Sequence, residues 1–146
     1  MDELIEALKV VLGTSFTLYL NLHSAHWNCE GINFPELHGL FGEQYAAVWE
    51  SVDDTAEKIR QMDAYAPGTM ERFIQLSRIQ GNGKPQPPRE TLVALLGDHE
   101  TMIALLTETL HIAEKADQQG VVNYLAGLIE NHAKYRWMLR VTAKKV

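Results

Sequence analysis

The stretch from His23 to Arg60, HSAHWNCEGINFPELHGLFGEQYAAVWESVDDTAEKIR, decides both the fold and the site that we expect. It joins two helical patterns through a short turn at residues 30–33. Two imidazoles and two carboxylates lie inside these patterns, and all four are side chains that bind iron and similar metals: His26, His38, Asp53 and Glu57. Gly42 stands one helical turn after His38, where a further carboxylate would complete the set.

Length and composition predict a single domain over residues 1–146, with a core of ordinary size. Hydrophobic residues make up 46% of the chain, but no apolar run is long enough to span a membrane. The acidic, amphipathic start of the chain does not resemble a signal peptide. Cys29 is the only cysteine, so no internal disulfide can form, which fits a cytoplasmic location.

The net charge of -6 argues against nucleic-acid binding, because such binding depends on Lys and Arg neutralising phosphates. The only basic cluster, Lys144 and Lys145, is too small to form a convincing DNA-binding arm. A negative surface instead attracts cations. We therefore expect no direct DNA binding and no membrane partner.

Helical periodicity runs through the whole chain, without a convincing strand pattern. Long helices are predicted over residues 2–27, 34–65, 88–116 and 121–141, and a short one over residues 69–77. The flexible-looking segment GNGKPQPP, residues 81–88, lies in the middle connection. Four long helices joined in this way predict an all-α, ferritin-like four-helix bundle with one long crossover that carries a short extra helix.

The second predicted helix carries two stripes of side chains. One is an ordinary apolar core stripe, made of Phe34, Leu37, Phe41, Val48, Val52, Ile59 and Met62. The other holds His38, Gly42, Tyr45, Trp49, Asp53 and Glu57. Because this second stripe contains large aromatic residues, we infer that another subunit covers it. His38 and Asp53 would lie about 22 Å apart along one helix, too far to share an ion. Two copies packed antiparallel about a twofold axis would bring the histidines of one to the carboxylates of the other.

At these residues the chain resembles the Dps family, the mini-ferritins. The likeness rests on HWNCEGINFPELH at residues 26–38, DDTAEKI at residues 53–59, APGT at residues 66–69 and WML at residues 137–139. The resemblance implies a hollow homododecamer built on twofold dimers that oxidises Fe(II) with peroxide or oxygen, stores ferric iron and protects against oxidative damage. The implied ligands are His26 and His38 of one subunit with Asp53 and Glu57 of its neighbour.

The chain departs from the family pattern at Gly42, where the family usually has Asp. We expect one iron position, built on His26, Asp53 and Glu57, to remain competent, and a second position near His38 to be weaker. The alternative is a non-catalytic cage or metal-sequestering shell with a degraded ferroxidase site. Relatives that bind DNA carry a Lys-rich extension, whereas this chain begins almost directly at its first helix, so we expect no direct DNA binding.

Two other readings stay open at this point. Glu108 and His111 form a Glu-x-x-His motif, which diiron bundle proteins use inside the bundle, but the motif occurs only once. Trp27 either packs beside the site or quenches radicals there. His23 follows the core stripe and is expected to be structural.

Overall fold

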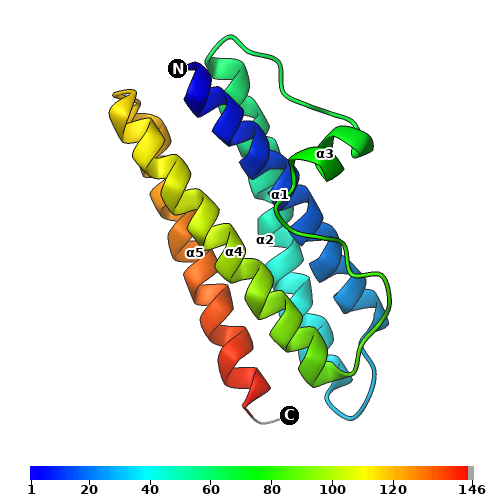
Figure 1. The fold of residues 1–146 in the computed structure, drawn as a ribbon. Helices are drawn as coiled ribbons and strands as arrows, with labels where there is room; N and C mark the ends of the chain where they lie inside the picture. The colour runs from blue at the N-terminus through cyan, green and yellow to red at the C-terminus, as the bar shows by residue number, and fades with distance from the viewer. Residues whose placement is uncertain (145–146) are drawn as a thin grey trace.

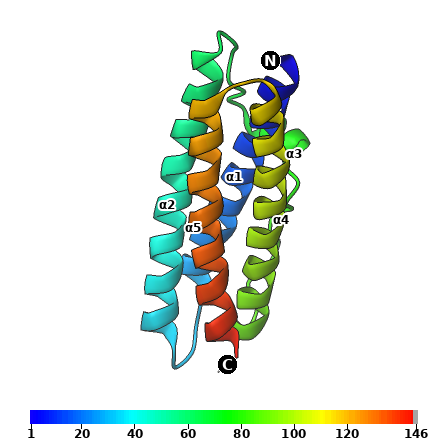
Figure 2. The same ribbon diagram turned by 90° about the vertical axis from the view of Figure 1, so that its left-hand side faces the viewer.

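The computed structural model describes residues 1–144, which form five helices: α1 (Asp2–Asn28), α2 (Phe34–Gln61), α3 (Met70–Leu76), α4 (Pro88–Lys115) and α5 (Gln119–Ala143). The helix α1 pairs with α2, and α4 pairs with α5 (Figures 1 and 2). A long connection carrying α3 runs along α1 between α2 and α4, so that α2 and α4 point the same way (Figure 1). The predicted all-α bundle with one crossover is therefore confirmed.

Local sequence explains where the helices begin and end. Pro35 and Pro88 occupy the first turns of α2 and α4, where a missing amide proton costs no helical hydrogen bond. The helix α2 ends at Gln61, earlier than the predicted residue 65, because Asp63 adopts a left-handed backbone conformation with φ +60°. The Arg60 guanidinium donates a hydrogen bond to the Ala64 carbonyl at 2.8 Å and holds this turn.

Leucines from the long helices fill most of the core, as their spacing predicts. Two members of the predicted α2 stripe, Leu37 and Phe41, are buried, whereas Phe34 is 38% exposed. Phe34 is exposed because it begins its helix, where it stacks on the imidazole of His38 with ring centroids 4.9 Å apart. None of the helices in residues 1–144 is long and apolar enough to cross a membrane.

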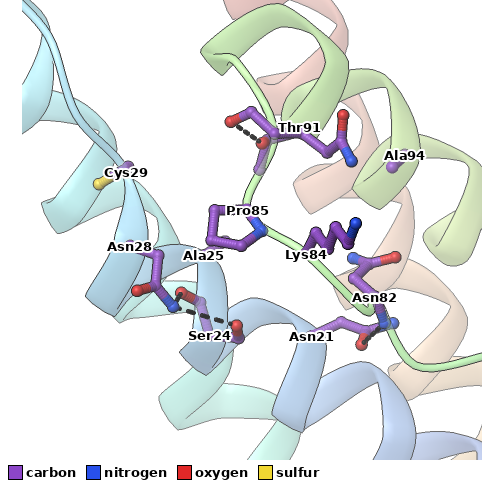
Figure 3. A pocket seen from close by; sticks show the side chains of 11 residues that line it. Asn21, Ser24, Ala25, Asn28, Cys29, Asn82, Lys84, Pro85, Thr91 and Ala94 are labelled. Atoms are coloured by element: carbon purple, nitrogen blue, oxygen red, sulfur yellow. Dashed lines mark hydrogen bonds between the residues drawn. The ribbon is translucent and has the colours of Figure 1, made fainter.

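The crossover is attached to the bundle through Asn21 of α1. The Asn21 amide donates to the Gln80 carbonyl and to the Asp98 carboxylate, and its oxygen accepts from the Asn82 amide at 3.0 Å. Figure 3 shows the small pocket between α1, this connection and the start of α4. Its volume of about 30 Å³ accommodates little more than one water molecule, so it is a packing feature and does not hold substrate.

A second polar cluster lies inside the bundle, where three helices meet. The His99 imidazole donates from Nε2 to the Gln44 side-chain oxygen at 2.9 Å. His99 is then neutral, so its Nδ1 accepts the proton of His132 Nδ1, also at 2.9 Å. Burial, with the neighbouring His132 adding, holds the pKa of His99 well below its usual value, and burial lowers the pKa of His132 to about 4.

This neutral pair makes the stability of the bundle sensitive to acid. The folded-state pKa of His132 is about 4, against 6.5 for the free side chain, so the unfolded chain binds more protons between these values. The free energy of unfolding therefore keeps its highest value above about pH 6.5 and falls as the pH drops towards 4. His132→Asn keeps a donor for His99 and removes one titrating group. The wild type is expected to lose about 3 kcal/mol more than this variant between pH 7.5 and pH 4.

Urea denaturation at pH 7.5, 6, 5 and 4 measures this difference. The carboxyl of Asp98 also titrates in this range, because burial raises its pKa to about 6. Its contribution is the same in both proteins and cancels in the comparison. Parallel stability curves for wild type and His132→Asn would contradict the assignment.

Candidate metal centre

Reciprocal hydrogen bonds join His26, in the last turn of α1, to His38, near the start of α2. Each imidazole Nδ1 lies 2.7 Å from the backbone carbonyl oxygen of the other residue. The two rings stack with centroids 3.6 Å apart and planes inclined by 18°. This pair of hydrogen bonds, which we call the histidine clasp, ties the end of one helix to the start of the next.

The histidine clasp fixes the tautomer of both rings. A carbonyl oxygen can only accept, so Nδ1 of each ring carries the proton. The remaining nitrogen of each ring, Nε2, makes no hydrogen bond within the described residues. A neutral imidazole whose Nδ1–H is held by a carbonyl is the arrangement in which histidine usually binds a metal.

Aromatic side chains surround the histidine clasp. His23 accepts or donates a hydrogen bond with the Tyr19 hydroxyl at 2.8 Å and stacks on Tyr45 at 3.8 Å, nearly parallel. Trp27 packs on the other side of His23 at 3.9 Å but stays 58% exposed. Burial, together with the nearby His26, lowers the pKa of His23 and favours its neutral form. His23 and Trp27 therefore stack on each other, and His23 lies beside His26.

The two carboxylates lie one turn apart on the exposed face of α2. The hydrogen bond between Asp53 and Glu57, and the repulsion between their charges, raise the pKa of Glu57. A divalent cation would relieve that repulsion, so the pair fits a cation on the basis of its own chemistry. Asp53 also lines a depression of about 610 Å³ together with Trp49, Pro67 and Phe73.

One chain does not bring the four predicted ligands together. The helix α2 is continuous from Phe34 to Gln61, so the rise of 1.5 Å per residue holds His38 and Asp53 about 22 Å apart. Accordingly, residues 1–144 contain no group of three or more His, Cys, Asp or Glu side chains placed to hold a metal. The structure thus presents two half-sites on one protomer, one of histidines and one of carboxylates.

The alternative site inside the bundle is wrong. Glu108 forms a bidentate ion pair with Arg78 of the crossover, at 2.8 and 3.3 Å, and lies at the surface. His111 is also exposed and pairs with Glu114 at 3.0 Å. Neither side chain points into the bundle, because both are exposed. Sequence spacing identified the Glu-x-x-His motif but could not show which face of α4 carries it.

Comparisons with known proteins identify the family to which this fold belongs. A family model described as the ferritin-like domain matches residues 5–146. An uncharacterized low temperature-induced protein of Nostoc is 34% identical over 140 residues, covering 93% of this chain and 77% of that protein. DNA protection during starvation protein 2 of Bacillus anthracis is 28% identical over 138 residues, covering 94% of each chain.

The fold also matches solved structures. The crystal structure of a Dps protein from Vibrio cholerae O1, described as a member of a broad superfamily of ferritin-like diiron-carboxylate proteins, superimposes with a TM-score of 0.92 at 24% identity. The match covers 96% of this chain and 88% of that one. The chain therefore belongs to the ferritin-like family, and its Dps-named relatives support the Dps family within it. This membership supports a role as an iron-storage mini-ferritin.

Proposed function

We propose that this protein is a Dps-type ferroxidase that binds Fe(II) between two copies of the chain related by a twofold axis. His26 and His38 of one copy face Asp53 and Glu57 of the other. Hydrogen peroxide or oxygen accepts the electrons, and the ferric product is stored inside a hollow oligomer of twelve subunits in the cytoplasm. Removing Fe(II) and peroxide together would protect the cell against oxidative damage.

The separation of the two half-sites carries this proposal. Each half-site is well formed by itself: the imidazoles have free Nε2 atoms, and the carboxylates face solvent one turn apart. Both lie on one helix about 22 Å apart, so a second copy must complete the ligand set. The 51% exposed Trp49 lies on the same stripe between them and supplies apolar area for such a contact.

The chain's own residues bind and orient the iron, and iron and the oxidant carry out the redox chemistry. Two Fe(II) ions supply two electrons and solvent supplies two protons, so that one molecule of hydrogen peroxide becomes two molecules of water and two Fe(III) ions result. Two imidazoles and two carboxylates leave open coordination positions for the oxidant, and this mixed ligand set suits iron that must react. The histidine clasp keeps the imidazoles in one orientation throughout.

Mixing two variant subunits tests whether the site is shared. His26→Ala/His38→Ala subunits lack one half-site, and Asp53→Ala/Glu57→Ala subunits lack the other, so each protein alone is expected to be inactive. In a mixed twofold dimer, one site loses all four ligands and the other keeps all four. Random mixing at equal amounts should therefore restore about one quarter of the wild-type sites. Stopped-flow loss of Fe(II) with peroxide measures the recovery.

A matched control for this experiment is the mixture of each variant with itself after the same unfolding and reassembly. No recovery in the mixed sample, when both variants assemble normally, would contradict a site shared between subunits. Full activity of either variant alone would show that its mutated residues are not ligands.

Gly42 keeps a second candidate function open, namely a shell that sequesters metal without catalysing oxidation. We expect one Fe(II) to bind tightly at each site, on His26, Asp53 and Glu57, and a second to bind at least about tenfold more weakly near His38. Anaerobic titration of Fe(II), followed by calorimetry, measures both steps. Two equally tight ions would contradict this expectation, and peroxide-dependent rates equal to those in free solution would favour the non-catalytic shell.

A further inference from the structure

The absent side chain at Gly42 leaves space that the imidazole of His26 fills. A Cβ atom built on Gly42 would lie 3.2 Å from both Cε1 and Nδ1 of the His26 ring. That separation is closer than ordinary van der Waals contact, so the ring would have to move by a few tenths of an ångström. The ring has little freedom to do so, because its Nδ1 is bonded to the His38 carbonyl at 2.7 Å.

Helix geometry explains why the His26 ring lies on residue 42 and not elsewhere. In an α-helix the carbonyl of residue 38 points towards the amide of residue 42, one turn further on. A side chain from α1 that donates to the His38 carbonyl must therefore approach along the surface of the helix beside residue 42. The hydrogen bond from His26 and a side chain at position 42 compete for the same space.

The geometry points to Gly42 as a positioning residue of the histidine half-site, a role that rests on the proposed function of that site. Gly42 lets His26 form the histidine clasp, and the clasp leaves Nε2 of both imidazoles as the donor atoms of this half-site. With glycine at position 42, the half-site lacks the carboxylate that the family usually has there, but its two imidazoles are held in fixed orientations. A half-site of this kind suits borderline divalent cations that favour nitrogen, such as Co2+, in addition to Fe(II).

Two variants change position 42, and a third serves as the matched control. Gly42→Ala adds only the Cβ atom, and Gly42→Asp adds the carboxylate that the family usually has. Gly39→Ala makes the same change three residues earlier on α2, where nothing lies within 4 Å of the added atom. Both alanine variants replace glycine in a helix, so both should preserve or raise the thermal stability.

Two measurements test the inference. The first is a crystal structure of each metal-free protein, and the second is a titration of each assembled protein with Co2+. Gly42→Ala is expected to displace the His26 ring, lengthen its hydrogen bond to the His38 carbonyl and weaken Co2+ binding at least about fivefold. Gly42→Asp is expected to displace the ring in the same way. Gly39→Ala should leave both the ring and the Co2+ affinity unchanged. A residue with a merely structural role would alter thermal stability without changing Co2+ affinity.

Three outcomes would overturn the inference. The first is a Gly42→Ala protein that keeps both 2.7 Å hydrogen bonds together with wild-type Co2+ affinity. The second is a displaced ring without any loss of Co2+ affinity. The third is a Gly42→Asp protein that keeps the clasp and gains a tight second Fe(II). Failure of the wild type to oxidise Fe(II) would remove the proposed function alone, because neither measurement depends on turnover.

Discussion

The rigidity of α2 is the constraint on which the rest of the structure depends. One uninterrupted helix carries both His38 and Asp53, and hydrogen bonds along its backbone keep them about 22 Å apart. No movement of side chains closes such a distance within one protomer. The same helix buries Leu37, Phe41 and Ile59 against its own bundle and leaves Asp53, Glu57 and Trp49 exposed. The residues of α2 that pack against the bundle are therefore different from the residues that we propose to bind metal.

The interior of the bundle shows the other side of this division. Its polar positions hold Gln44, His99 and His132, which satisfy one another through hydrogen bonds and remain neutral. Buried groups of this kind cost little when every partner is present, and they fix how the helices meet. Within residues 1–144 no carboxylate forms a hydrogen bond with His99 or His132, so this cluster resembles a structural core and not a cation site. The side chains that we propose as ligands lie at the ends and outer face of α1 and α2 instead.

Sequence pattern predicted much of this arrangement because the main signals are local. Periodic leucines, prolines in first turns and the long central connection gave the four-helix bundle and its crossover. The pattern failed where a boundary depended on one residue's backbone, as at Asp63, which ends α2 early. It also assigned Phe34 to the core, although a residue at the start of a helix has no preceding turn to cover it. The hydrogen bonds of the core histidine pair could not be predicted from the sequence, because His99, His132 and Gln44 come from three separate helices.

The sequence by itself determined the family, the helices and the four residues expected to bind iron. It also determined that the two histidines and the two carboxylates cannot meet in one chain, because the rise of a helix per residue is fixed. Only the tertiary structure decided how His26 and His38 hold each other, which nitrogen of each ring is free, and that the His26 ring fills the space beside Gly42. Those facts depend on the close approach of two different helices, which residue spacing within either helix cannot predict.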